Sequence, residues 1–313
     1  MFVGHGLLAF AFAAAAAHLA GWSRERALLV GALAGGFALA PDVDMLYAPV
    51  GLVGAHGPLD AAAGFWSAGN RIHRAVTHSL LVGGVVAVAA GAWATGTRSG
   101  RGVAVAVLAA VVAVAAAASG VLAAGVLLVL AAAALGLATA GTRRGLRART
   151  VAGAAALGLL SHPFGDLLTG EPPAFLYPLD AALVAARPAA FADPTLNLLA
   201  PLYLELATMW LALGVYLWVD GARLADYLAG RATFGVGFAA ATVLLPAPTL
   251  EVSYHFVLPL LATGAVLSAP LPGLEARSLA DLRDHPLRAA TTGLAAVSIA
   301  VVGYTVAYLG TAF

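Results

Sequence analysis

The chain has 313 residues, of which 62% are hydrophobic and only 10% are charged, and its mean hydropathy is +0.93. Soluble domains carry roughly a quarter charged residues, so this composition indicates a membrane protein. The formal net charge is +1, and the sixteen basic residues, all arginines, are scattered in small groups, which argues against nucleic acid as a partner. The absence of cysteine excludes thiolate ligands, so any metal must be bound through nitrogen and oxygen atoms.

Apolar segments recur along the whole chain, and most are long enough to cross the hydrocarbon core of a bilayer as helices. We therefore expect an all-α fold, a polytopic transmembrane bundle of about ten helices. The first apolar run begins directly after Met1, without the basic region of a signal peptide, and we interpret it as a retained helix. A turn at Ser119 and Gly120 is expected to divide one long apolar stretch. The expected spans are residues 2–20, 27–41, 78–97, 102–119, 121–141, 150–168, 197–219, 232–249, 253–271 and 288–311.

The arginines predict an orientation for this bundle, because short loops rich in arginine lie on the cytoplasmic side. If the chain crosses the membrane at every expected span, thirteen of the sixteen arginines fall on one side. Both termini then lie on the other side, together with a set of histidines and aspartates. This set is expected at the non-cytoplasmic interface of the membrane and comprises His5, Asp42, Asp44, His73, His78, His162 and Asp166.

The first polar motif of this set is ALAPDVDML, in which Pro41 is expected to end the second helix. In an extended segment, residues two apart face the same way, so Asp42 and Asp44 could both point at one cation. The alternative is that the two carboxylates are polar caps in the headgroup layer.

The second motif, NRIHRAVTHSLL, places His73 and His78 five residues apart at the start of the third span. We expect Thr77 to be the N-cap residue, which would leave His73 in the preceding loop, free to fold back beside His78. Arg74 lies between them, and its planar guanidinium suits a phosphate or carboxylate oxygen. The alternative is that these side chains simply reach toward lipid headgroups.

The third motif, LLSHPFGDLLTG, carries His162 and Asp166 at positions i and i+4 of an apolar helix, so both lie on one helical face. Polar pairs inside a membrane helix are costly unless they are paired or functional. A structural hydrogen bond between the two side chains is the alternative. Taken together, the motifs predict a divalent-metal site built by distant parts of the chain, of the mixed imidazole and carboxylate kind that activates water.

In this order and spacing, VGHGLLAF, LAPDVDML, HRAVTHSLL and LLSHPFGDLLT followed by FLYPL resemble the family of inner-membrane-associated, metal-dependent hydrolases described as LexA-binding. The resemblance covers residues 1–180, and the HRxxTHSLL element is its most specific part. More distantly, the same pattern is similar to the zinc-dependent phospholipase C and P1 nuclease superfamily. This sequence lacks that superfamily's N-terminal tryptophan and further downstream histidines, so one or two ions are expected rather than three.

The resemblance implies a membrane-embedded hydrolase domain in residues 1–180, followed by an additional transmembrane bundle of unknown role in residues 181–313. The implied activity is hydrolysis of a phosphoester, with a lipid or lipid-linked phosphoester as one candidate substrate and Zn²⁺ as the expected metal. Arg74 would bind a phosphoryl oxygen, and Asp44 and Asp166 would serve in catalysis. The implied ligands are His5, Asp42, Asp44, His73, His78, His162 and Asp166. A divalent-metal transporter and a non-catalytic membrane scaffold with a structural metal remain the alternatives.

Overall fold

The computed structural model describes residues 3–69, 74–168, 170–250, 252–269 and 279–312. These residues form helices and connecting segments, with no strand among them, so the predicted all-α class is confirmed. The chain divides into two compact units, Met1–Pro188 and Ala189–Phe313. The sequence placed its functional boundary at residues 180 and 181, and the roles assigned to the two parts stay predictions.

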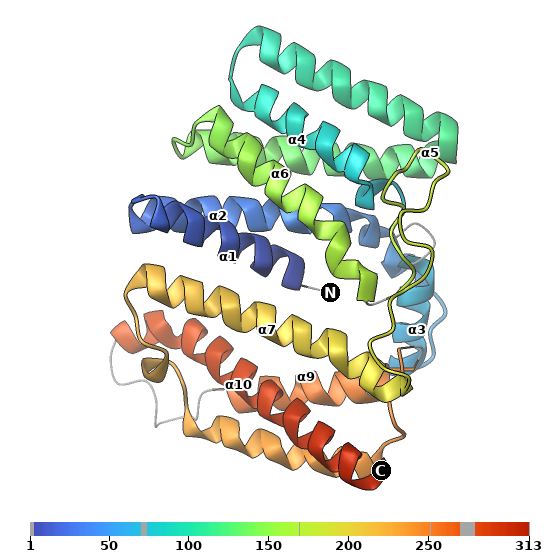
Figure 1. Cartoon of the computed structure of the whole chain (residues 1–313), viewed down its shortest axis with the longest axis vertical. Coiled ribbons are helices and arrows are strands. Elements are labelled where there is room, and N and C mark those ends of the chain that lie inside the picture. Colours follow the sequence, from blue (N-terminus) through green and yellow to red (C-terminus); the bar gives the residue numbers. More distant parts are fainter. Residues whose placement is uncertain (1–2, 70–73, 169, 251, 270–278, 313) are drawn as a thin grey trace. The chain divides into compact units, whose positions relative to one another are not determined.

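The first unit is a bundle of apolar helices, and the segments that connect them lie at two opposite ends of the bundle (Figure 1). The pairs α1 with α2, α4 with α5, and α6 with both α2 and α4 pack against each other. In chain order its elements are α1 (Gly4–Leu19), α2 (Arg24–Leu39), the 3-10 helix η1 (Ala40–Leu52), α3 (Pro58–Gly69), η2 (Val76–His78), α4 (Leu80–Ala94), α5 (Arg98–Arg143), α6 (Ala148–Gly165) and η3 (Asp166–Leu168).

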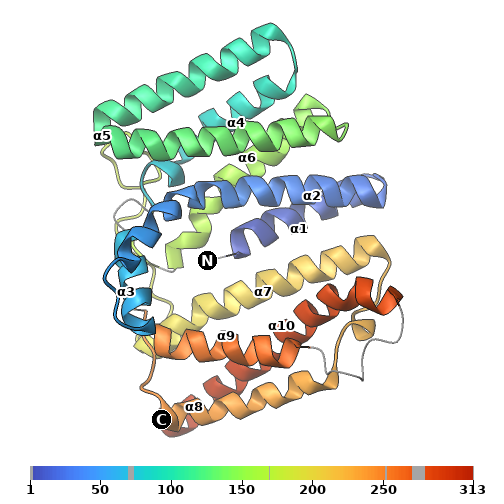
Figure 2. The same ribbon diagram turned by 180° about the vertical axis from the view of Figure 1, so that it is seen from behind.

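The long element α5 consists of two helical arms that meet at Gly120. This residue has φ 84° and ψ −175°, a backbone conformation that suits glycine. The chain reverses there, and the two arms run back in opposite directions (Figures 1 and 2). The turn predicted at Ser119 and Gly120 is therefore confirmed.

Helices α2 and α6 approach each other closely at Gly158. A Cβ atom on this glycine would lie 2.5 Å from the carbonyl oxygen of Ala34, 2.6 Å from the nitrogen of Ala38 and 2.7 Å from the Cβ of Phe37. Small residues allow such close approach in membrane proteins, where packing of helix backbones replaces the hydrophobic effect between helices. The contact places the next turn of α6, which carries His162, against the last turn of α2.

Two features of the connection between α2 and α4 differ from the prediction. The segment after Pro41 is a 3-10 helix, η1, and not extended chain. The region expected as a loop also contains the helix α3, which packs on η1 so closely that a Cβ on Gly64 would overlap the carbonyl oxygen of Gly51. Hydropathy alone could not predict these two elements, because η1 continues the apolar span of α2 and α3 does not stand out from the loop around it.

The second unit contains α7 (Pro194–Asp220), η4 (Leu224–Asp226), η5 (Gly230–Ala240), α8 (Ala241–Leu244), α9 (Tyr254–Ser268) and α10 (Leu279–Ala312). Its core includes Phe256, Leu260 and Tyr304, with Leu199 of α7. The span expected at residues 232–249 is instead the 3-10 helix η5, followed by one short α-helical turn that ends before Pro246. Gly235 lets η5 lie directly on α10, because a Cβ there would overlap the carbonyl oxygen of Ala296.

Four helical segments of the described chain are long and apolar enough to cross a membrane: Arg24–Leu52, Arg98–Arg143, Pro194–Asp220 and Pro286–Thr311. Shorter apolar helices are Gly4–Leu19, Leu80–Ala94 and Tyr254–Ser268. These segments coincide with most of the expected spans. The exposed large apolar side chains on α5, such as Val105 and Leu128, are those that lipid would cover.

Candidate metal centre

Four side chains from separate parts of the first unit meet in one small group: Asp42, His78, His162 and Asp166. Each offers one ligand atom, and these atoms all lie within 4.8 Å of one another. His78 and His162, which are 84 positions apart in the chain, bring their Nε2 atoms to 2.8 Å. The expectation that these motifs share a common centre is therefore met.

The other distances within the group are similar. The Nε2 atom of His78 lies 3.0 Å from Oδ2 of Asp166 and 3.8 Å from Oδ1 of Asp42. The Nε2 atom of His162 lies 3.5 Å from Oδ1 of Asp42 and 4.0 Å from Oδ2 of Asp166. Ligand atoms about 2.0 Å from a tetrahedral zinc ion are about 3.3 Å from each other. The four donors thus have the spacing of a shell around a single ion.

The position of His162 follows from the way α2 ends. Pro41 has no N–H group, so it cannot donate to the backbone carbonyls three and four residues before it. The carbonyl oxygen of Ala38, three residues before Pro41, instead lies 2.6 Å from Nδ1 of His162. A carbonyl only accepts, so Nδ1 carries the proton and donates it. In the neutral ring, Nε2 then holds a lone pair that points into the group.

His78 is fixed in the same tautomer by a chain of two hydrogen bonds. The hydroxyl of Thr77 donates to Oδ2 of Asp44 at 2.7 Å. Since a hydroxyl has only one proton, its oxygen must accept from Nδ1 of His78, which lies 2.9 Å away. Nδ1 is also 3.4 Å from Oδ2 of Asp44. The Nε2 lone pair of neutral His78 therefore points at that of His162.

Two lone pairs only 2.8 Å apart repel each other unless a positive species lies between them or beside them. A metal ion is one such species, and a proton is the other. Burial alone would lower the pKa of His78, which lies ahead of α4, but its hydrogen bonds and charge interactions with Asp166 and Asp44 outweigh burial and raise the pKa to about 9. A metal ion bound beside the two Nε2 atoms would take the place of such a proton.

We predicted Thr77 as the N-cap of α4, but the N-cap is Ser79. The Ser79 hydroxyl accepts hydrogen bonds from the backbone N–H groups of Leu81 and Val82, and it donates to the carbonyl of Tyr177 at 2.8 Å. Ser79 has the extended backbone of an N-cap residue, with φ −77° and ψ 132°. Thr77 is thereby left for the bond to Asp44, and the FLYPL segment is attached to the start of α4.

Asp44 does not join Asp42 in the group, because residues two apart in a 3-10 helix point in widely different directions. The possibility that both carboxylates face one cation rested on extended chain, which this segment does not form. Asp44 is fully buried and lies on the Nδ1 side of His78, away from the ligand atoms. Its place is that of the outer carboxylate that orients a metal-binding histidine.

His5, at the start of α1, also reaches this region. Its Nε2 atom is 3.3 Å from Oδ1 of Asp166, and its ring centroid is 4.2 Å from that of His162. His5 therefore contacts the oxygen of Asp166 that does not face His78. It lies beside the four-residue group and outside it. His73, the remaining expected ligand, lies outside the described residues.

Arg74 holds the chain around Asp166. Its Nη1 donates to the carbonyl oxygens of Asp166, at 3.3 Å, and Glu171, at 3.0 Å, while Nε lies 3.7 Å from Oδ2 of Asp166. A Cβ on Gly170 would overlap Nη1, so the loop wraps closely around the guanidinium. Arg74 has a positive φ of 68°, which is rare for residues other than glycine. Its direct contact with a phosphoryl oxygen stays a prediction.

Sequence reasoning missed two outer contacts of the group, the Thr77 hydroxyl and the Ala38 carbonyl. Pro41 signals the second, because a proline at a helix end leaves earlier carbonyls without their usual partner. Nothing in the sequence distinguishes Thr77 from Ser79 as the cap. His56 lies just before α3, and its backbone N–H donates to Oδ2 of Asp60 in the first turn of that helix.

Comparison with known families supplies the remaining context. The model of the family described as YdjM inner membrane protein matches residues 1–223, about seven tenths of the chain. The chain belongs to the YdjM inner membrane protein family. No curated protein and no solved structure matches it significantly.

Membership of this family, together with the apolar helices, establishes that the chain is an inner-membrane protein. The YdjM match includes all the residues of the metal-binding group. It continues past residue 180, where the resemblance noted in the sequence ended, and takes in α7 of the second unit. The family description names a location and no reaction.

Proposed function

We propose that this YdjM family protein binds one divalent metal ion, with Zn²⁺ the best fit, and uses it to hydrolyse a phosphoester. The observation that carries the proposal is the pair of Nε2 atoms that face each other while both Nδ1 atoms are held by acceptors. Histidines that bind metals in proteins typically donate a hydrogen bond from the N–H of their other ring nitrogen in this way. A purely structural contact between the rings would not need both tautomers fixed.

His78, His162, Asp42 and Asp166 would hold the ion, a donor set of two nitrogens and two oxygens that suits zinc. A bound divalent ion would lower the pKa of a water molecule toward neutrality and polarise a phosphoryl oxygen. The side chain of Asp42 is 27% exposed, whereas those of the two histidines are fully buried and that of Asp166 is 3% exposed. Asp42 is thus the member of the group that solvent reaches.

The side chains in and around the metal-binding group would have different roles in the reaction. Asp42, with its access to solvent, is placed to accept a proton from the attacking water. Asp166 is held by His5 on one oxygen and approached by Arg74 and His78 on the other, so it is oriented from several sides. Arg74 acts by positioning Asp166 and its loop. Asp44 and Thr77 keep the His78 ring in the required tautomer.

The proposal also includes the side of the membrane. Within the first unit, the metal-binding group lies where α1 begins and α2 and α6 end, and the arginine-bearing loops lie at the other end (Figure 1). Since short arginine-rich loops face the cytoplasm, we place the group on the non-cytoplasmic side. Membrane lipids are then neighbours of the site, and a lipid-linked phosphoester is a candidate substrate.

The test uses the purified full-length protein, stripped of metal and then reloaded with Zn²⁺, Mn²⁺ or Co²⁺. We expect one ion per chain by elemental analysis and release of phosphate from at least one of a phosphomonoester, a phosphodiester and a phospholipid. The Asp42→Asn variant should lose activity, while Asp60→Asn, which changes a carboxylate of α3, should keep it. Stoichiometric metal without hydrolysis of any substrate would contradict the enzymatic part, and zinc uptake into sealed vesicles would favour a transporter.

The outer hydrogen bonds give a more specific prediction. Thr77→Val keeps the shape of the side chain but removes the hydroxyl that links His78 to Asp44. We expect metal affinity to fall about 10- to 100-fold, the usual effect of losing an outer partner of a metal-binding histidine. Titration with a competing chelator measures the change. Thr263→Val, which removes a hydroxyl bonded to its own helix in α9, is the matched control and should leave affinity unchanged.

A further inference from the structure

One end of the first unit is strongly basic. The connections between α1 and α2, between α4 and α5, and between α5 and α6 lie at this same end, opposite the metal-binding group (Figures 1 and 2). They carry eight exposed arginines and one acidic residue, Glu25. We call this surface the basic end; its arginines are Arg24, Arg26, Arg98, Arg101, Arg143, Arg144, Arg147 and Arg149.

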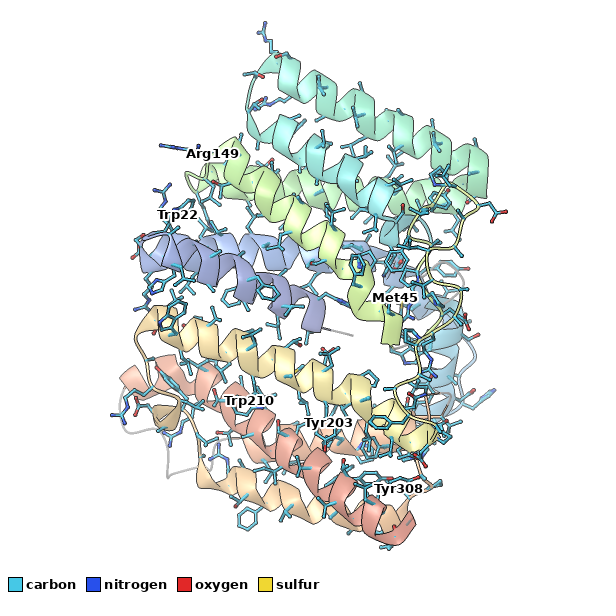
Figure 3. The ribbon with its side chains drawn as sticks, in the orientation of Figure 1. Trp22, Met45, Arg149, Tyr203, Trp210 and Tyr308 are labelled. Atoms are coloured by element: carbon cyan, nitrogen blue, oxygen red, sulfur yellow. The ribbon has the colours of Figure 1, made fainter. Side chains whose placement is uncertain are left out.

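Two of these arginines are stacked on tryptophans in the same manner. The guanidinium carbon of Arg26 lies 5.4 Å from the ring centroid of Trp22, and that of Arg101 lies 5.5 Å from that of Trp93. Both indoles are half-buried against the helix core, and Trp93 Nε1 also donates to Thr139 at 2.9 Å. Trp22 and Arg149 are labelled at the basic end in Figure 3. The stacking therefore recurs in two separate helical hairpins.

Five of these eight arginines occupy places that helix stability does not favour. Arg24 and Arg26 lie in the first turn of α2, Arg98 and Arg101 in the first turn of α5, and Arg149 in the first turn of α6. The N-terminus of a helix carries partial positive charge, which disfavours cations and favours anions. Residues that oppose the local preference of a helix are expected at functional sites.

We propose that the basic end is a binding surface for the headgroups of anionic phospholipids. Tryptophan is enriched at the level of lipid headgroups, and an arginine stacked on it places a planar donor at the same depth. The guanidinium fork matches two phosphate oxygens. The chain is an inner-membrane protein with apolar helices behind this surface. A phospholipid would contact both the arginines and the apolar helices behind them. Its phosphate would bind the arginines, and its acyl chains would lie along the helices.

The experiment measures lipid binding to the purified full-length protein in uncharged detergent micelles. Phospholipids with brominated acyl chains quench the fluorescence of nearby tryptophans, and the probes are brominated phosphatidylglycerol and brominated phosphatidylcholine. We expect phosphatidylglycerol to quench at several-fold lower concentration. The Arg26→Ala/Arg101→Ala variant should lose about 25-fold in affinity for phosphatidylglycerol, since each arginine near an anionic surface contributes about fivefold. Arg187→Ala, which removes one charge from the segment after α6, is the control and should bind as the wild type does.

Several outcomes would overturn the proposal. These are equal quenching by the two lipids, unchanged affinity in the double variant, and displacement of phosphatidylglycerol by millimolar inorganic phosphate, which would point to a site for free phosphate. The double variant should keep its helix content and its metal affinity, because the metal-binding group lies at the other end of the unit. If it does not fold, wild-type protein decides the matter: rising salt must weaken phosphatidylglycerol binding and leave phosphatidylcholine binding unchanged.

Discussion

The His162→Ala variant is expected to lose the metal ion altogether. His162 supplies one of four donor atoms, and it is held in place by the Ala38 carbonyl. Removing a ligand should weaken binding by more than about 100-fold, the upper range for losing only an outer partner. Wild-type protein at a free metal concentration 100 times its Kd should gain about 2.7 kcal/mol of stability, and the variant should gain less than about 0.4 kcal/mol at the same concentration. Elemental analysis and thermal unfolding with and without chelator measure both effects.

The matched control for His162→Ala is His255→Ala. His255 lies in the second unit, where its Nε2 is 2.9 Å from the carbonyl oxygen of Pro246. This change removes an imidazole without touching the metal-binding group, so metal content and the stabilisation by metal should both equal those of the wild type. A His162→Ala protein that retains one ion per chain would show that the ion binds elsewhere, and the proposed centre would have to be abandoned.

The residues that the sequence predicted best are those whose spacing has a fixed meaning in a helix. His162 and Asp166 are four residues apart in an apolar segment, so they share a face whatever surrounds them. Gly120 was recognisable as a turn because little else interrupts the stretch from residue 102 to 141. The convergence of the three motifs followed from counting spans and placing arginines on one side. The four-residue group agrees with that inference.

The predictions that failed depended on local geometry that tertiary contacts decide. PDVD can form extended chain or a 3-10 helix, and only packing of η1 against α3 and η2 distinguishes them. That choice separates Asp42, which faces the two Nε2 atoms, from Asp44, which supports His78 from behind. Thr77 and Ser79 are both good N-cap residues, and the carbonyls of Phe175 and Tyr177 select Ser79. These carbonyls lie nearly a hundred residues away in sequence.

The outer contacts of the two histidines distinguish a metal site from simple pairing better than the number of ligands does. Clusters of histidine and aspartate are found in proteins without bound metal, and pairing alone would explain most of their distances. The two fixed tautomers are harder to explain, because Asp44 through Thr77 and Ala38 each set the proton on Nδ1. With both rings neutral, neither Nε2 can donate to the other, so their 2.8 Å contact needs a proton or a metal ion between or beside them.

The close contact of α2 with α6 gives the second large effect. A Cβ added at Gly158 would lie 2.5 Å from the Ala34 carbonyl oxygen and 2.6 Å from the Ala38 nitrogen, both backbone atoms that cannot rotate away. Gly158→Ala must therefore separate the two helices, and overpacking of this kind costs about 1–3 kcal/mol. The separation also lengthens the 2.6 Å contact from His162 to the Ala38 carbonyl. We expect metal affinity to fall at least about 10-fold, as for other losses of an outer partner.

The same substitution at Gly153 provides a control of opposite sign. Gly153 lies on the exposed side of α6, and a Cβ there would meet nothing within 4 Å. Alanine is preferred over glycine inside a helix by about 0.5–1 kcal/mol, so Gly153→Ala should stabilise the protein slightly and leave metal affinity unchanged. Thermal unfolding and chelator titration of both variants measure the contrast. If the two variants behave alike, the contact at Gly158 does not hold the metal centre together, and His162 must be positioned in some other way.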